Sequence, residues 1–192
     1  VPKGYDQALI HNLQQPRPIE LGFVGSLKSG VYQQRKTFLE ELARVEQMEI
    51  VRTQSGQDYV DKLNSIRFFA SADIGMGEYM IKNFEAMASG CVLLAWRQGS
   101  GEADAVDEEQ ALGFRDMENI VLYSSMEECR AKLQQLRHDP ALAARIAAAG
   151  QALVEQQYSF EQLGSKIAAA LQPPPRQRAD YPLSLSQRLF GL

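Results

Sequence analysis

One acidic residue, Glu85, lies in the segment of the chain that offers the clearest chemistry. It belongs to the run Asn83–Leu94, NFEAMASGCVLL, in which apolar residues recur at helical spacing before Gly90. A glycine suits the left-handed position that ends a helix, and the apolar run 91–96 that follows is typical of a buried strand. A carboxylate on such a helix, near the carboxyl edge of a parallel sheet, can accept two hydrogen bonds from a sugar diol. The segment therefore predicts a site for a nucleotide ribose.

A second group of candidates follows the apolar strand expected at 19–24. Gly25, Ser26 and Lys28 form a turn of small residues in which the backbone can approach an anion. The turn matches neither the G-x-G-x-x-G pattern nor a P-loop, so it does not fit the hydride-cofactor and phosphoryl-transfer templates. Lys28 and Arg35 are each either a cation for a diphosphate, Arg35 with a bidentate fork, or a solvated basic residue.

Alternating strand and helix patterns position these candidates. We expect strands at 19–24, 49–53, 66–70, 91–96 and 120–123, with helices at 33–47 and 58–65, a helix carrying Glu85, and three capped closing helices, the middle one ending at Gly150. This alternation predicts an α/β fold, a Rossmann-like parallel sheet with helices on both faces. Ligands then bind at the carboxyl ends of the strands. We assign 1–18 to a linker, 19–172 to this domain and 173–192 to a Pro-rich, basic tail.

Composition excludes several classes of function. The chain has 192 residues, 45% of them hydrophobic, and a net charge of −4, which argues against a nucleic-acid binder. No apolar run approaches the roughly 18 residues of a membrane span, and we predict a cytoplasmic protein. Cys91 and Cys129 are expected to be reduced structural thiols, and two histidines are too few for a multi-histidine metal site. The acidic loop at about 97–118 is expected to be solvated.

The FEAMASG segment resembles the signature of the group 1 glycosyltransferases. Phe23–Ser26, FVGS, followed by Arg35, resembles the opening of the nucleotide-binding half of the GT-B architecture. The similarity is closest to a branch resembling spore-maturation glycosyltransferases, in which a basic residue precedes Phe-Glu-Ala, and Lys82 holds that place. The resemblance extends from about residue 19 to residue 171.

The resemblance implies a metal-independent glycosyltransferase of the hexosyltransferase type, without a cofactor, whose donor is a UDP- or GDP-linked sugar. It implies that Glu85 binds the ribose hydroxyls. It also implies that the diphosphate is faced by Gly25, Ser26, Arg35 and Lys82, together with the backbone N–H groups of Tyr79, Met80 and Ile81. The base would lie beside Gln54 and Ser55. Basic side chains and helix amino ends would stabilise the leaving diphosphate.

Glu78 departs from the family pattern. Many relatives carry two glutamates with seven residues between them, the first contacting the donor sugar, whereas six residues separate Glu78 from Glu85. Seven positions are close to two helical turns, so the two acids can share a helix face. Alternatively, Glu78 is a solvated acid at the helix start, where the dipole favours it. The resemblance thus gives Glu78, Arg35 and Lys82 as the catalytic candidates.

The length of the chain suffices for one half of a GT-B enzyme. The first hypothesis is therefore a donor-binding domain that works with an acceptor-binding second half, missing from this chain or carried on a separate one. The second is a non-catalytic Rossmann-like scaffold or interaction module, which the altered glutamate spacing favours. The basic tail, with Arg176, Arg178 and Arg188, is a candidate for contact with a membrane surface or partner.

Overall fold

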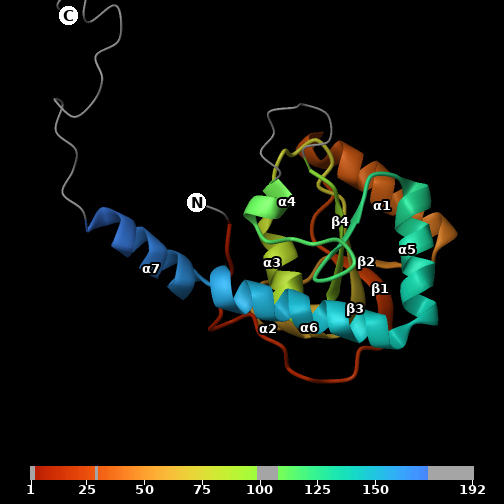
Figure 1. Cartoon of the computed structure of the whole chain (residues 1–192). Helices are drawn as coiled ribbons and strands as arrows, with labels where there is room; N and C mark the ends of the chain where they lie inside the picture. Colours follow the sequence, from red (N-terminus) through yellow and green to blue (C-terminus); the bar gives the residue numbers. More distant parts are fainter. Residues whose placement is uncertain (1–2, 29, 99–107, 173–192) are drawn as a thin grey trace, which may run out of the picture.

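Five parallel strands form one sheet in the order β2-β1-β3-β4-β5 (Figure 1). The computed structural model describes residues 3–28, 30–98 and 108–172, so the predicted tail and its contacts lie outside the described residues. The strands are β1 (Ile19–Val24), β2 (Glu49–Val51), β3 (Ile66–Ser71), β4 (Val92–Trp96) and β5 (Val121–Tyr123). The Rossmann-like prediction is confirmed, and all five strands lie within about two residues of their expected positions.

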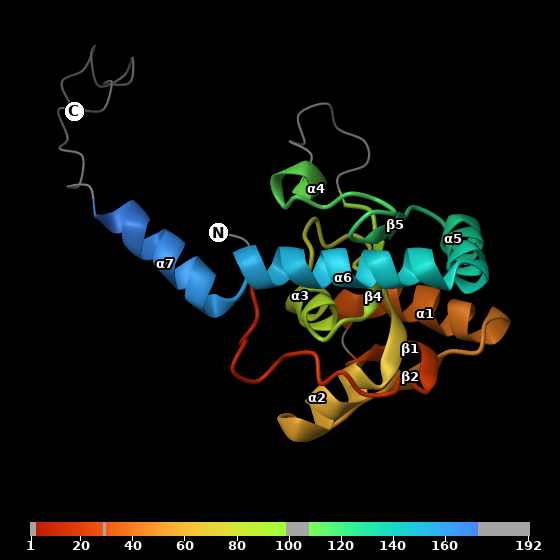
Figure 2. The ribbon, with the colours of Figure 1, turned by 60° about the horizontal axis from the view of Figure 1, so that its bottom comes forward.

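Helices cover both faces of the sheet. They are α1 (Gln33–Val45), preceded by the 3₁₀ turn η1 (Gly30–Tyr32), then α2 (Gln57–Asn64), α3 (Ile81–Ala88), α4 (Glu108–Ala111), α5 (Met126–His138), α6 (Pro140–Gln157) and α7 (Phe160–Leu171). On one face lie α1 and α5, and Glu46 at the end of α1 forms ion pairs with Arg130 and Arg137 of α5. The ring of Phe38 on α1 contacts Trp96 and Tyr123. The other face carries α2 and α3, with α6 packed against α3 and β4 (Figure 2).

The central strands are buried because helices cover them on both sides. Phe68, Phe69, Leu93 and Leu94 are each at most 1% exposed, which explains why β3 and β4 are continuously apolar rather than alternating. From β1 the chain moves to β2 on one side of the sheet and then crosses to β3 on the other. The carboxyl ends of β1 and β3 therefore flank the switch point at which folds of this class bind ligands.

The prediction that Gly150 ends a helix is wrong. Helix α6 continues to Gln157, and a Cβ on Gly150 would lie 2.6 Å from the carbonyl oxygen of Asn119. The glycine therefore permits close packing of α6 against the loop before β5, a tertiary requirement with the same sequence signature as a helix stop. The predicted cap is confirmed at the start of α6, where the Asp139 side chain accepts a hydrogen bond from the N–H of Leu142.

The acidic loop is not uniformly solvated, and that prediction is wrong for Glu109. This residue is 5% exposed, accepting hydrogen bonds from the Tyr79 hydroxyl at 3.0 Å and from Arg97 at 2.6 Å. Arg97, which follows β4, and the phenol of Tyr79, which precedes α3, compensate for the removal of the Glu109 carboxylate from water. Three other acids of the loop, Glu102, Asp104 and Asp107, lie outside the described residues.

The segment predicted as a linker is irregular, but its described part packs against the domain. Tyr5 and Ile10 are each 2% exposed. Arg17 donates hydrogen bonds to the carbonyl oxygens of Ile66, at 2.8 Å, and Ser89. The segment thereby connects the start of β3 with the carboxyl end of α3, and it extends the folded unit beyond the boundary expected at residue 19.

The last helix, α7, extends away from the body of the domain (Figures 1 and 2). It leaves Phe160, Ile167 and Leu171 exposed at positions that share one helix face. No helix among the described residues is long and apolar enough to cross a membrane.

Candidate functional site

A cavity of about 380 Å³ opens beside the switch point of the sheet. Its walls come from the N-terminal segment, the turn after β1, the loop after β2, the first turn of α2, and α3. Six of the residues predicted from the sequence line it: Gly25, Ser26, Gln54, Ser55, Lys82 and Glu85. Tertiary structure thus brings together candidates that are as much as 60 residues apart in the chain.

Helix α3 directs a cation and an acid into the cavity. Lys82 and Glu85 are three residues apart and therefore share one face of the helix. Burial lowers the pKa of Lys82, an effect that Glu85 opposes and Arg35 reinforces. A bound anion would favour the charged form of this amine and so oppose the effect of burial.

Tyr59, on α2, contacts both of these charged groups. Its hydroxyl donates a hydrogen bond to Glu85 Oε2 at 2.5 Å, and Lys82 Nζ lies 3.5 Å from the same hydroxyl and 4.7 Å from the ring centroid. Burial raises the pKa of Tyr59 well above its ordinary value, and the neighbouring carboxylate raises it further. The phenol therefore stays protonated and acts as a donor to Glu85.

Gly25 gives Lys82 the room to reach the cavity. A Cβ on Gly25 would lie 2.9 Å from Lys82 Cε and about as close to the ring of Phe23. The N–H of Gly25 donates to the carbonyl oxygen of Val51 at 2.9 Å, which ties the turn to β2. Gly25 therefore supplies space at the cavity wall, while its own N–H group is already used by the sheet.

Lys28 and Glu78 are among the predicted residues that lie outside the cavity lining. Lys28 is exposed in the turn after β1, and its backbone N–H donates a hydrogen bond to the Ser26 hydroxyl oxygen at 3.3 Å. Glu78 is exposed in the loop before α3 and forms an ion pair with Lys3 at 2.5 Å. The proposed contacts of Lys28 with a diphosphate and of Glu78 with a donor sugar remain predictions.

The predicted backbone donors lie at the amino end of α3. Tyr79 is buried and hydrogen-bonded through its hydroxyl to Glu109, and the N–H of Met80 donates to Asp73 Oδ2 at 3.3 Å. Ile81 begins the helix, with its side chain 43% exposed. First-turn N–H groups have no partner within their own helix. An anion beside Lys82 would therefore meet the positive end of α3.

Arg35 is committed to a buried ion pair. The side chains of Arg35 and Asp73 are 5% and 2% exposed, and Arg35 Nη2 donates to Asp73 Oδ1. Asp73 Oδ2 also accepts from Asn83 at 2.7 Å and from the Ser71 hydroxyl at 3.3 Å. This cluster joins α1, the end of β3 and the first turn of α3. A direct contact between Arg35 and a diphosphate stays a prediction.

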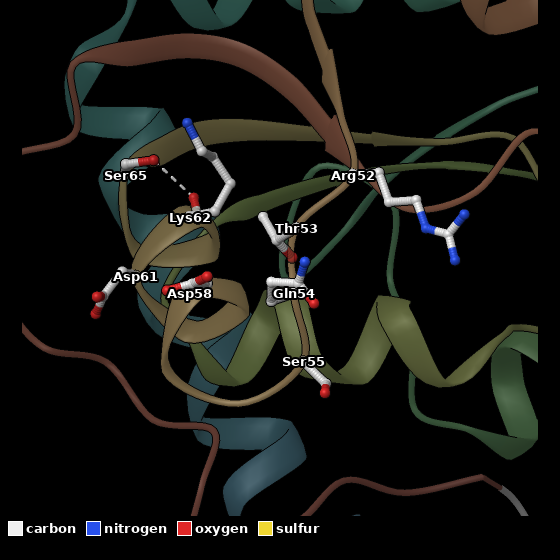
Figure 3. A pocket seen from close by; sticks show the side chains of 8 residues that line it. All are labelled: Arg52, Thr53, Gln54, Ser55, Asp58, Asp61, Lys62 and Ser65. Carbon is white, nitrogen blue, oxygen red and sulfur yellow. Dashed lines mark hydrogen bonds between the residues drawn. The ribbon is translucent and has the colours of Figure 1, made fainter.

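A second, larger hollow of about 1000 Å³ shares the loop after β2 (Figure 3). Asp58, Asp61 and Lys62 line it from α2, and the figure shows Arg52 directed away from these carboxylates. Lys62 is paired with Glu49 at 3.0 Å. Since two acids face this hollow and its lysine is neutralised, it suits a diphosphate less well than the smaller cavity does.

Sequence reasoning missed part of the cavity wall: Leu9, Ile10, Arg52, Thr53 and Tyr59. Tyr59 falls within the helix predicted at 58–65 and was not assigned to the site. Its hydroxyl is the signal that could have singled it out, since a buried phenol needs a hydrogen-bond partner. Leu9 and Ile10 carry no such signal, because only the tertiary path of the N-terminal segment brings them to the cavity.

The sequence profile of the glycosyl transferase-like family matches residues 7–169. The chain belongs to this family. Its matched span begins within the N-terminal segment and includes every residue that lines the cavity. No curated protein matches the chain.

Solved structures of glycosyltransferases share the fold. The C-terminal domain of a group 1 family glycosyl transferase, LpcC from Francisella tularensis, has 16% identity and a TM-score of 0.53, over 82% of this chain and 100% of that one. Sucrose-phosphate synthase from Thermosynechococcus elongatus has 16% identity and a TM-score of 0.56, over 88% of this chain and 52% of that one. HepE from Anabaena, solved with UDP-glucose, has 17% identity and a TM-score of 0.56, over 82% of this chain and 42% of that one. The fold is thus that of a GT-B C-terminal domain, and the chain spans about half or less of the latter two proteins.

Proposed function

We propose that this chain is the donor-binding domain of a glycosyltransferase and that its 380 Å³ cavity holds a nucleoside diphosphate sugar. The convergence of Lys82, Glu85 and the turn at Gly25 on one cavity is the observation that carries the proposal. A nucleoside diphosphate carries an anionic diphosphate next to the neutral diol of its ribose. The cavity correspondingly places a cation, Lys82, next to an acid, Glu85. The family membership of the chain supports the same assignment.

The polarity of the ligand follows from the charges. The diphosphate lies beside Lys82 and the amino end of α3, both of which attract an anion. The ribose hydroxyls donate to Glu85, since a carboxylate accepts hydrogen bonds and repels phosphate. The base then occupies the end bounded by the loop at Gln54 and Ser55 and by the apolar side chains of Leu9 and Ile10. HepE, which shares the fold, was solved with UDP-glucose, which supports a uridine diphosphate donor.

Titration calorimetry with uridine diphosphate and guanosine diphosphate tests the proposal. The unmodified chain is expected to bind one of them, and Glu85→Ala is expected to weaken that binding about tenfold or more, the effect of losing a hydrogen bond to a charged group. Glu40→Ala is the matched control, because Glu40 is an exposed acid on α1 that pairs with Lys36. Its affinity should equal that of the unmodified chain.

A different result favours the runner-up. If neither nucleotide binds, or if Glu85→Ala binds as tightly as Glu40→Ala, the cavity is not a nucleotide site of the kind described. The non-catalytic scaffold then becomes the better account of a family member with altered glutamate spacing. A thermal-shift panel of nucleoside diphosphates gives an independent measurement, since a ligand that binds the native state raises its melting temperature.

A second, acceptor-binding half completes the proposed enzyme. The support is length: the chain covers 52% of sucrose-phosphate synthase and 42% of HepE. We expect the chain alone to bind donor without transferring its sugar, and transfer to require the second half in the same chain or on a partner. Sugar transfer by the isolated chain would contradict this part of the proposal.

We also propose that donor binding is independent of metal ions and that the domain works in the cytoplasm. Lys82 and the amino end of α3 supply the positive charge that a divalent ion supplies elsewhere. Cys91 and Cys129 are both buried free thiols, as suits a reducing compartment. A chelator that abolishes nucleotide binding would oppose the first statement, and cell fractionation tests the second.

A further inference from the structure

We propose that Tyr59 is a positioning residue that holds the Glu85 carboxylate for the ribose diol and thereby sets the preference of the cavity for ribose over deoxyribose. This inference rests on the proposed function of the cavity. It adds a residue that the sequence analysis did not assign to the site.

The contact between the two side chains is direct. The Tyr59 hydroxyl donates to Glu85 Oε2 at 2.5 Å, across the space between α2 and α3. Among the described residues, Tyr59 supplies the one side-chain hydrogen bond that Glu85 accepts. The bond occupies one site on Oε2, which leaves the sites on Oε1 for hydroxyl groups of a ligand. Tyr59 thus fixes the carboxylate without saturating it.

Glu85 needs such support because of where it lies. A glutamate that is only half-buried samples several rotamers, and one that binds a diol must hold its two oxygens in a single orientation. Tyr59 is itself restrained, since its ring packs under the Lys82 ammonium at 4.7 Å. Tyr59 therefore fixes the position of Lys82, which would contact the diphosphate, relative to that of Glu85, which would contact the ribose.

Tyr59→Phe tests this role, because phenylalanine keeps the ring under Lys82 and removes the hydroxyl. The variant also removes the long contact, 3.5 Å, of that hydroxyl with Lys82 Nζ, a loss that bears on the ribose and deoxy forms alike. The probes are uridine diphosphate and guanosine diphosphate, each compared with its 2′-deoxy analogue by titration calorimetry. The unmodified chain is expected to bind the ribose form more tightly. In Tyr59→Phe we expect the affinity for the ribose form to fall about fivefold, the effect of losing part of a charge-assisted hydrogen bond, and that for the deoxy form to change little. The ratio of the two affinities therefore falls.

A double-mutant cycle separates positioning from a purely structural effect. If Tyr59 acts through Glu85, then Tyr59→Phe has little further effect in a Glu85→Gln background, and the two effects are not additive. Tyr158→Phe is the matched control, since its hydroxyl donates to the carbonyl oxygen of Leu112 at 2.8 Å, away from the cavity. This control is expected to lower the melting temperature and leave the ribose preference unchanged.

Each outcome bears on the inference. A lower ribose preference in Tyr59→Phe, together with a non-additive cycle, supports it. An unchanged preference, additive effects, or an equal change in Tyr158→Phe overturns it, even when Glu85→Ala weakens nucleotide binding as the proposed function requires. Absence of nucleotide binding by the unmodified chain overturns the proposed function and this inference together.

Discussion

Two acid–base pairs lie near the amino end of α3, and their surroundings differ. Arg35 and Asp73 form one pair, almost completely buried, in which Asp73 also accepts hydrogen bonds from Asn83 and from the backbone of Met80. The other pair, Lys82 and Glu85, is half-buried on the wall of the cavity, and Tyr59 stands between its members. The first pair has its partners inside the protein, whereas the second leaves capacity for a ligand.

The difference between the pairs teaches how burial assigns roles to similar residues. A buried charge must be compensated by the protein itself, so Arg35 and Asp73 fix α3 against α1 and β3. A half-buried charge keeps part of its solvation and can exchange water for a ligand. The buried pair therefore stabilises the packing of α3, and the half-buried pair is available to a ligand. Substitutions in the first pair should affect folding, and substitutions in the second should affect binding.

The largest expected effect is that of Asp73→Ala on stability. Removing this carboxylate leaves the buried Arg35 guanidinium uncompensated and deprives Asn83 of its acceptor. We expect the free energy of unfolding to fall by about 3–5 kcal/mol. Urea denaturation measures this loss, with Glu49→Ala as the control, because Glu49 belongs to a partly exposed pair with Lys62 that should contribute about 1 kcal/mol or less. Equal losses in the two variants would erase the distinction between buried and exposed pairs.

The next effect is that of Lys82→Met on binding. Methionine keeps the length and apolar stem of the side chain but removes its charge, so we expect nucleoside diphosphate affinity to fall about tenfold. Stability should change little, because the ammonium is half-buried and its interaction with Glu85 is not one of the direct ion pairs that the described residues form. Calorimetry and thermal denaturation together give both quantities. Lys62→Met, which removes a lysine from the neighbouring hollow, should leave affinity intact.

The smallest effect is the pH dependence of binding. Burial lowers the pKa of Lys82 from its ordinary value of 10.5, and a bound diphosphate favours the charged amine. Affinity should therefore fall as pH rises from neutral through this lowered pKa, with the loss beginning at a lower pH than for an exposed lysine. The difference between the unmodified chain and Lys82→Met, followed across that range, isolates this contribution. A difference that stays constant with pH would remove Lys82 titration as its cause.

Much of the fold follows from local sequence. Apolar runs and caps placed all five strands and the longer helices, because strand burial and helix capping depend on residues close together in the chain. The errors share one cause. Gly150 has the signature of a helix stop yet serves packing against Asn119, and Glu109 is acidic yet buried against Arg97 and Tyr79. In both cases the deciding partner is distant or unmarked in the sequence.

The sequence by itself determined the Rossmann-like fold and which segments would meet at its carboxyl edge, because parallel strands linked by right-handed crossovers bring their ends together. It also marked Glu85 and Lys82, whose three-residue spacing fixes them on one helix face. Only the tertiary structure decided that Arg35 pairs with Asp73, that Tyr59 holds Glu85, and that the N-terminal segment closes the cavity wall. The physical reason is that solvent access and hydrogen-bond partners are set by side chains from distant segments.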